Sequence, residues 1–398
     1  MKKQKFRSAN ISGSEKALSR QELELREERM LAPYAMKARD SRGRLHEEEE
    51  HPYRSAYQRD RDRIIHSAAF RRLEYKTQVF VYHEGDYYRT RLTHTLEVTQ
   101  IARTISKILG LNEDLTEAVS LAHDVGHTPF GHAVEATLNG LMARDGGFDH
   151  NTQGLRVVDI LEERYPSFKG LNLSWETREG IIKHSTTRVH RYPKEFLKRG
   201  HKQPLLETQV MDVADEIAYD SHDLDDGIKS GMLTEDDLRS VALWNKACAQ
   251  IKNEYSNISR ELRVYLAIRN LINLQVGNLI DTTIANIRKF DIRSVSDVIQ
   301  CAHRMVTFGK ELRDLRAELR SFLYKRLYCH WRVVRMSDKA KRFVTELFSV
   351  YLNNPELLPP GASRGKNIKR NICDHIAGMT DRYALQEYKR LFDPYEKV

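Results

Sequence analysis

Apolar residues recur at helical spacing along most of this chain. One clear case ends at Gly110, where steps of three or four positions define one face of a predicted helix, formed by His94, Val98, Ile101, Ile105 and Ile108. This spacing is typical of an amphipathic helix whose apolar face packs against the protein core. The pattern therefore predicts that the His94 side chain points inward.

A second helix is predicted directly after this one, and a third near residue 210. In the second, Asn112 or Asp114 can cap the first turn, and the apolar face consists of Leu115, Val119 and His123. The third, within 210–226, has apolar residues on one side and, at steps of four on an adjacent stripe, Asp215, Tyr219 and Asp223. The pattern thus predicts a second inward histidine and an unusually polar stripe beside the core.

The rest of the chain predicts an all-α fold with at most a short hairpin. Residues 54–72 have the pattern of a basic helix, and residues 77–91 fit a short hairpin or loop around a Gly-Asp break. Further amphipathic helices are predicted from about residue 236 onward, with a break at 353–365. We expect three parts, namely a charged N-terminal arm (1–35), a helical core that carries the candidate site (36–235) and a packed C-terminal helical region (236–398).

Composition narrows the class of protein. The chain has 398 residues, which exceeds the roughly 250–300 at which a single core stops growing. Lys and Arg (65) exceed Asp and Glu (56), and the net charge of +9 favours an anionic partner such as a phosphate compound. No apolar run is long enough to cross a membrane, the four cysteines form no CxxC, and the basic start leads into no apolar segment. We therefore expect a soluble cytoplasmic protein with no membrane partner.

Candidate chemistry gathers on the predicted helices. His94, His123 with Asp124, and Asp215 supply two imidazoles and two carboxylates, a mixed set that suits a divalent metal such as Mn, Mg or another first-row transition metal. Taken singly, each histidine is better explained as a hydrogen-bonded core residue. Together they favour a metal site, because a buried His-Asp pair is costly unless its charge is compensated.

Five sequence blocks add a family resemblance. FRRLEYKTQVF, RTRLTHTLEV, AHDVGHTPFGHAVE, DEIAYDSHDLDD and AGMTDRYAL resemble the deoxyguanosinetriphosphate triphosphohydrolase-like (dGTPase-like) family of HD-domain phosphohydrolases. The resemblance spans most of 36–390, makes 36–235 the HD catalytic domain, and assigns the metal to His94, His123, Asp124 and Asp215. It implies hydrolysis of a deoxynucleoside triphosphate (dNTP) to deoxynucleoside and inorganic triphosphate. It also implies a homo-oligomer, often a hexamer, and in some members a regulatory nucleotide.

The resemblance also implies roles for residues around the metal. His127 and His132 become candidates for phosphate donor, general acid or general base. Glu135 becomes a candidate for a relay with His132. The resemblance implies that Arg91 binds the phosphates and that Gln78 contacts the sugar or base. It implies that Tyr219 packs on the sugar and that Asp223 accepts a hydrogen bond from the 3′-hydroxyl. Without the resemblance, simpler explanations stand for three of them: a surface salt bridge for Arg91, a loop amide for Gln78 and a solvated helix residue for Glu135. His150, Lys183 and His184 are further, weaker candidates for the pocket.

A basic patch leaves other functions open. Arg71, Arg72 and Lys76 can meet the phosphates of substrate, of a regulatory nucleotide or of single-stranded nucleic acid, although a solvated helix face explains them equally well. Nearby aromatic residues suit base stacking or a subunit interface, and these are Tyr75, Phe80, Tyr82, Tyr87 and Tyr88. The alternatives to a dNTP triphosphohydrolase are another HD phosphohydrolase, either a nucleotidase or a phosphodiesterase, and a nucleic-acid-binding or dNTP-sensing protein.

Overall fold

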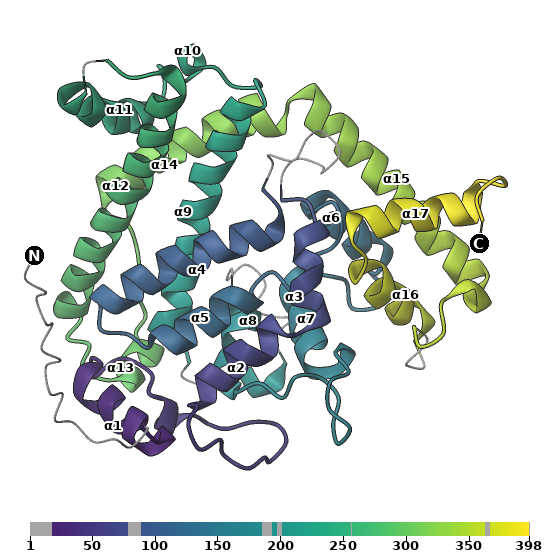
Figure 1. The fold of residues 1–398 in the computed structure, drawn as a ribbon, viewed down its shortest axis with the longest axis horizontal. Helices are drawn as coiled ribbons and strands as arrows, with labels where there is room; N and C mark the ends of the chain where they lie inside the picture. The colour runs from purple at the N-terminus through teal and green to yellow at the C-terminus, as the bar shows by residue number, and fades with distance from the viewer. Residues whose placement is uncertain are drawn as a thin grey trace, which may run out of the picture.

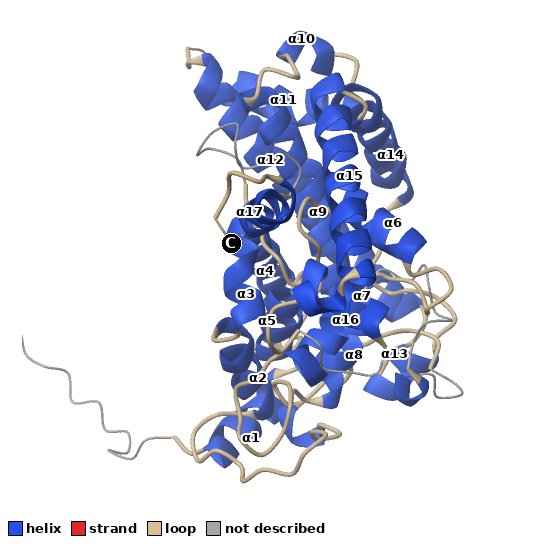
Figure 2. Ribbon diagram, turned by 90° about the vertical axis from the view of Figure 1, so that its right-hand side faces the viewer, coloured by secondary structure: helices blue, strands red, loops and turns tan. Residues whose placement is uncertain are grey.

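The structure is a computed structural model that describes residues 18–78, 89–184, 193–196, 201–255, 257–362 and 367–397. Within these ranges it consists of helices and loops without a strand, as Figure 2 shows, which confirms the all-α prediction. Most of the predicted hairpin, residues 79–88, lies outside the described residues. Its two flanks meet in an isolated antiparallel bridge between Thr77 and Thr90.

The helices that carry the candidate site lie in the first part of the chain (Figure 1). Their bounds are α1 Arg20–Met30, α2 Ala56–Ile65, α3 Ala68–Arg72, α4 Arg91–Ile108, α5 Glu113–Ala122, α6 His132–Leu141, α7 His150–Arg156, α8 Trp175–Lys183 and α9 Leu206–Lys229. The later helices are α10 Glu235–Leu238, α11 Ala242–Glu254, α12 Arg260–Lys289, α13 Val295–Gln300, α14 Lys310–Leu323, α15 Trp331–Asn353, α16 Ile368–Ala377 and α17 Asp381–Phe392. A π-helical turn, Tyr324–Tyr328, follows α14 directly.

Helix ends follow from capping side chains and correct two sequence predictions. The predicted basic helix at 54–72 is two helices, because the Ser67 hydroxyl accepts the amide of Phe70 and starts α3 anew. Helix α4 begins at Arg91, slightly earlier than expected, since Thr90 caps it. Of the two predicted caps for α5, Asn112 is the one used.

The core is built around three helices that cross near the middle of the molecule. Helices α4, α5 and α9 pack on one another, and the apolar faces of α4 and α9 join α11, α12 and α14 in the largest hydrophobic cluster. A second cluster joins α6 to α15, α16 and α17, which lie on one side of the molecule in Figure 1. Both clusters combine residues from either side of position 235, and the three-part domain division stays a prediction.

The described part of the N-terminal arm, residues 18–35, contributes few residues to this core. Helix α1 buries none of its residues, whereas Ala35 just beyond it joins the largest cluster. Among the described residues, no helix is both long and apolar enough to span a membrane.

Candidate active site

The four predicted metal ligands meet where α4, α5 and α9 converge. His94 lies in the first turns of α4, His123 and Asp124 follow the last residue of α5, and Asp215 lies in the middle of α9. Asp215 Oδ1 is 2.8 Å from His94 Nε2 and 3.8 Å from His123 Nε2. Asp124 Oδ1 is 3.4 Å from His123 Nε2. Helical periodicity thus brings together side chains that are 121 positions apart in sequence.

The donor atoms of this group fit a divalent metal. One atom each of His94, His123 and Asp124 lies within 4.8 Å of the others, and Asp215 contacts both histidines. His123 Nδ1 is 2.6 Å from the Ser120 carbonyl, which directs Nε2 into the group, and that buried Nε2 has no hydrogen-bond partner in the described structure. A histidine held by a backbone carbonyl with its other nitrogen free is the usual arrangement of a metal ligand.

Both carboxylates of the group are ionised. Burial by itself would raise the pKa of Asp124, but His123 and Arg91 outweigh it and hold that pKa below its ordinary value. The pKa of Asp215 is also lowered, because its hydrogen bond with His94 and the neighbouring histidines outweigh burial. The group therefore offers two anionic carboxylates and two imidazoles, which together favour the binding of a cation.

Arg91 adds an anion-binding group to the same site. It is the first residue of α4, its side chain is only 2% exposed, and its Nη1 lies 3.1 Å from Asp124 Oδ2. Its Nε and Nη2 are buried without a hydrogen-bond partner in the described structure. This position is incompatible with the simpler explanation of a surface salt bridge. Buried guanidinium N–H groups are rarely left without a hydrogen-bond acceptor, so these two nitrogens indicate a binding site for an anionic ligand.

A second group of ionisable side chains lies next to the metal ligands. Glu135 on α6 accepts from His132 at 3.1 Å and from His150 at 2.9 Å, and the rings of His150 and His127 stack with centroids 4.1 Å apart. His127 Nε2 is in turn 3.3 Å from Asp124 Oδ1. The Glu135 side chain is only 13% exposed, so it is not a solvated helix residue, whereas His132 is 63% exposed. The group therefore runs from the metal ligands to the surface.

Gly126 explains how this second group is held so close to the metal ligands. A Cβ on Gly126 would lie 2.1 Å from the His150 carbonyl oxygen and 2.2 Å from the Gly154 amide nitrogen. The absence of a side chain lets the backbone after Asp124 approach α7 closely. That approach places His127 against His150.

The structure corrects the prediction that Lys76 belongs to a basic surface patch. Its side chain is buried, and Nζ donates to the carbonyls of His127 and Ala377, the latter at 3.0 Å. Burial, assisted by Arg72 and Arg91, lowers the pKa of Lys76 to about 7. Lys76 therefore supports the loop after Asp124 instead of facing solvent. Of the nearby aromatic residues, Tyr75 is exposed, and the others lie outside the described residues, namely Phe80, Tyr82, Tyr87 and Tyr88.

Two of the three predicted sugar-binding residues lie along α9 as expected. Tyr219 and Asp223 follow Asp215 at steps of four, and the Asp223 side chain is buried and accepts a hydrogen bond from the Tyr328 hydroxyl. Gln78 is partly buried, and its Oε1 has no hydrogen-bond partner in the described structure. Its main chain and the Arg91 guanidinium both lie beside Gly131. Contact with a sugar or base stays a prediction for all three.

Comparison with known proteins identifies the family. The chain is 52% identical to the deoxyguanosinetriphosphate triphosphohydrolase-like protein of Geobacter sulfurreducens, over 92% of this chain and 96% of that protein. Proteins of the same name from Thiobacillus denitrificans (47% identical, 91% and 97% covered) and Bordetella pertussis (50%, 91% and 96%) match as well. The chain belongs to the deoxyguanosinetriphosphate triphosphohydrolase-like family. Residues 91–220 match the HD domain, and residues 306–390 match the phosphohydrolase-associated domain.

As a member of the deoxyguanosinetriphosphate triphosphohydrolase-like family, this protein is an HD-domain phosphohydrolase. The HD match begins at Arg91 and includes all four predicted metal ligands. It ends at Asp220, so Asp223 lies just beyond it. The associated domain includes Tyr328, whose hydroxyl contacts Asp223.

Two residues of the site were weak or absent in the sequence argument. His184 Nδ1 is 2.7 Å from Asp212 Oδ1, and its Nε2 is 3.7 Å from Asp215 Oδ2. Although burial opposes it, the contact with Asp212 raises the pKa of His184 to about 9. Asp212 was missed, yet it precedes Asp215 by three positions on α9, and this helical step was the available signal. Lys183, by contrast, pairs with Glu179 at 2.6 Å.

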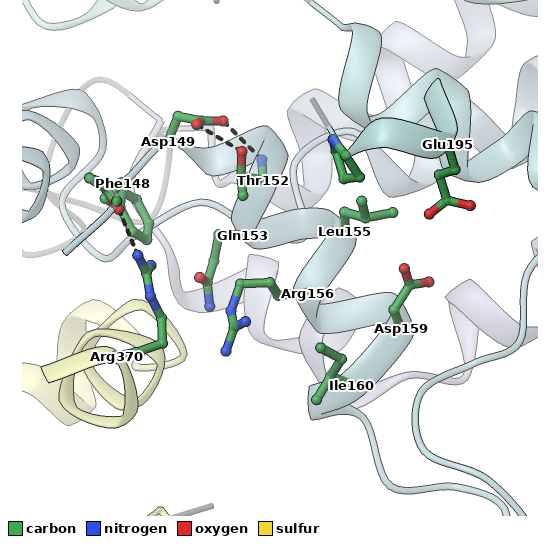
Figure 3. A pocket seen from close by; sticks show the side chains of 13 residues that line it. Phe148, Asp149, Thr152, Gln153, Leu155, Arg156, Asp159, Ile160, Glu195 and Arg370 are labelled. Atoms are coloured by element: carbon green, nitrogen blue, oxygen red, sulfur yellow. Dashed lines mark hydrogen bonds between the residues drawn. The ribbon is translucent and has the colours of Figure 1, made fainter. Parts of the chain in front are cut away.

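Several cavities lie near these groups, and one of about 620 Å³ is lined partly by Arg72, Lys76 and Gly126. One of about 350 Å³ lies between α9 and the turn after α14, and Asp215 and Tyr219 form part of its wall. Another of about 540 Å³ lies beside α7 and is shown in Figure 3. Its wall carries none of the predicted site residues, and of its two arginines Arg156 pairs with Asp374 while Arg370 donates to the carbonyls of Asp145 and Gly147. The cavity of about 350 Å³ therefore adjoins the predicted metal ligand Asp215, and the cavity beside α7 adjoins none of the four.

Proposed function

We propose that this protein is a metal-dependent dNTP triphosphohydrolase that releases deoxynucleoside and inorganic triphosphate. One observation carries the proposal: the buried Arg91 guanidinium keeps two unpartnered nitrogens directly beside the donor group of His94, His123, Asp124 and Asp215. Cation ligands and a buried anion receptor side by side suit a metal-bound phosphate chain. The relatives' name, which specifies deoxyguanosine triphosphate, supports a purine dNTP as one substrate.

Each part of the site then has a role in the reaction. A divalent metal held by the four ligands would act as a Lewis acid on the phosphate and lower the pKa of water. Arg91 offers Nε and Nη2 to phosphate oxygens and holds the chain in one orientation. Because the Arg91 side chain is buried, it excludes water from this end of the site and strengthens that contact.

Proton transfer falls to the second group. Glu135 holds His132 and His150 through separate oxygens, so each ring has a fixed orientation. His132 reaches toward solvent while remaining within 5.2 Å, centroid to centroid, of the His127 ring. We assign proton donation at the leaving 5′-oxygen to His132, with Glu135 as its orienting carboxylate. Burial, together with Arg91 and the other histidines, lowers the pKa of His127 and keeps that ring neutral.

The sugar would lie along α9. Tyr219 offers its ring for packing, and Asp223, one turn later, offers a carboxylate to the 3′-hydroxyl. Gln78 is placed to meet the sugar or base with its unpartnered Oε1. A homo-oligomer and a regulatory nucleotide remain predictions from the resemblance, and a single-stranded nucleic-acid partner remains a prediction from the basic residues.

The products decide between this reaction and those of other HD phosphohydrolases. The purified protein is incubated with each of the four dNTPs, alone and mixed, in Mn²⁺ or Mg²⁺, and products are identified by ion-exchange chromatography and phosphorus NMR. Inorganic triphosphate with deoxynucleoside is the expected result. Parallel incubations with a deoxynucleoside monophosphate and with a cyclic nucleotide test the alternatives: release of orthophosphate from the monophosphate would indicate a nucleotidase, and ring opening of the cyclic nucleotide would indicate a phosphodiesterase. Turnover only in the mixture would identify a required regulatory nucleotide.

A further inference from the structure

The four predicted metal ligands differ in how firmly the protein holds them. The side chains of His94, His123 and Asp124 are at most 4% exposed, whereas that of Asp215 is 24% exposed. Asp124 has an outer partner, because its Oδ2 lies 3.1 Å from Arg91 Nη1. Asp215 turns Oδ1 toward His94, at 2.8 Å. A ligand carboxylate keeps one orientation when a further residue holds its other oxygen, so Oδ2 of Asp215 is the atom to account for.

His184 faces this second oxygen. It directly follows α8 and is buried, and its Nε2 lies 3.7 Å from Asp215 Oδ2. Its ring centroid is 5.4 Å from that of His123, which places it beside the ligand group. A small rotation of the partly exposed carboxylate brings Nε2 and Oδ2 within hydrogen-bond distance. Each ligand carboxylate therefore has one outer nitrogen beside the oxygen that does not face the ligand histidines.

Asp212 fixes the orientation of the His184 ring. Nδ1 of the ring donates to Asp212 Oδ1 at 2.7 Å, and the Asp212 side chain is only 6% exposed. The other oxygen, Oδ2, accepts a hydrogen bond from Arg304 Nη2. A buried carboxylate that accepts on both oxygens has little freedom to turn, so the ring that it holds keeps one orientation.

Arg304 comes from a part of the chain that neither family match includes. It lies between α13 and α14, after the HD match ends at residue 220 and before the associated domain begins at residue 306. The two backbone amides that follow it donate to the side chain of the fully buried Gln209 on α9, at 3.0 and 3.2 Å. These bonds fix the loop against the same helix that carries Asp212 and Asp215.

We propose that His184 is a positioning residue that holds the metal ligand Asp215. Its Nε2 fixes Oδ2 of that carboxylate and leaves Oδ1 to the metal. Asp212 and Arg304 anchor the ring, so a loop outside the HD domain contributes to metal affinity. This inference rests on the metal dependence in the proposed function and is independent of which nucleotide is the substrate.

The test measures the affinity of the metal-free protein for Mn²⁺, by titration calorimetry and by the electron paramagnetic resonance signal of unbound Mn²⁺. Two substitutions divide the functions of the ring. His184→Asn keeps an amide nitrogen near the place of Nδ1 and loses Nε2, whereas His184→Gln keeps one near the place of Nε2. We expect His184→Asn to weaken Mn²⁺ binding about tenfold to a hundredfold, and His184→Gln to stay within about fivefold of wild type.

Arg304→Gln tests the anchor, with Arg156→Gln as its matched control. The two arginines are 26% and 28% exposed, and their carboxylate partners, Asp212 and Asp374, are 6% and 10% exposed. We expect Arg304→Gln to weaken Mn²⁺ binding about threefold to tenfold and Arg156→Gln to change it by less than about twofold. Thermal unfolding of the metal-free variants shows whether the two substitutions cost similar stability. In a His184→Asn background, Arg304→Gln should have no further effect on Mn²⁺ affinity.

The outcomes distinguish this inference from the proposed function. Wild-type affinity in His184→Asn, or equal losses in His184→Asn and His184→Gln, overturns the positioning role while the proposed function stands. An effect of Arg156→Gln as large as that of Arg304→Gln overturns the anchor. Failure of wild type to bind Mn²⁺ overturns the metal dependence and this inference with it. A protein that binds Mn²⁺ but releases no triphosphate from any dNTP overturns the proposed reaction and leaves this inference standing.

Discussion

Asp381 is predicted to hold two site-forming segments together from the far end of the chain. It is the first residue of α17 and is buried. Oδ2 accepts from the amide of Thr77 at 2.9 Å and from its hydroxyl, and Oδ1 accepts from the amide of Phe130 at 2.9 Å. Thr77 adjoins Gln78, and Phe130 lies in the loop between His127 and His132 with a positive φ of 58°.

Asp381→Asn keeps the size of the side chain but replaces one acceptor oxygen by an NH₂ group. Either orientation leaves at least one buried backbone N–H without an acceptor, which costs about 1–3 kcal/mol. The substitution also removes a negative charge that favours the charged form of Lys76. We therefore expect a loss in the free energy of unfolding of about 1–3 kcal/mol. Because the loop at Phe130 holds a strained backbone, we also expect turnover to fall about tenfold to a hundredfold.

The assays are denaturant unfolding, steady-state turnover and metal content. Metal content should stay normal, since Asp381 touches none of the four ligands. The control is Asp393→Asn, which alters an exposed carboxylate that accepts the amide of Tyr395 and should change stability by less than about 0.5 kcal/mol. Wild-type stability and turnover in Asp381→Asn would refute the reasoning.

Three further substitutions test other parts of the account. Asp124→Asn should abolish tight Mn²⁺ binding and turnover while the protein stays folded, as judged by calorimetry and circular dichroism; retained turnover would contradict the metal assignment. His132→Ala should leave Mn²⁺ binding intact and lower turnover ~10²–10⁴-fold, and an unchanged rate would remove His132 from proton transfer. Burial raises the pKa of Glu207 to about 7 from 4.5, so the folded state holds this proton more tightly and loses stability as pH rises from about 4.5 to 7. Glu207→Gln keeps Oε1, which accepts hydrogen bonds from the amides of Met36 and Asn112. Its free energy of unfolding should therefore exceed that of wild type by about 3 kcal/mol at pH 8 and by little at pH 4.5. The control Glu47→Gln, at an exposed position, should show no such gain at either pH.

The convergence of the four predicted metal ligands was predictable because the helix faces of His94, His123 and Asp215 follow from local periodicity and Asp124 directly follows His123. Steps of three and four place His94 and His123 on apolar faces, and the polar stripe from Asp215 to Asp223 depends on the same 3.6-residue repeat. Once those faces pack against one another, the ligands converge without further information. The family resemblance then added roles that spacing alone does not give, such as those of Arg91 and Glu135.

The parts that sequence reasoning missed or gave only weak support depend on contacts between distant segments. Lys76 reads as part of a basic surface, yet α16 and the loop after Asp124 cover it. Tyr328 lies in a stretch with an ordinary amphipathic pattern, and only the packing of α14 on α9 brings it to Asp223. His184 follows α8 in sequence without a spacing relation to Asp212. No periodic pattern in the sequence links any of these three positions to the residues that it contacts.

Hydrolysis in ¹⁸O-labelled water tests the central claim most directly. Metal-loaded protein is given a dNTP in H₂¹⁸O, and both products are analysed by mass spectrometry. Attack of water on the α-phosphorus predicts intact inorganic triphosphate with one ¹⁸O atom and an unlabelled deoxynucleoside. Labelled deoxynucleoside, labelled orthophosphate or a monophosphate product would contradict the proposed reaction.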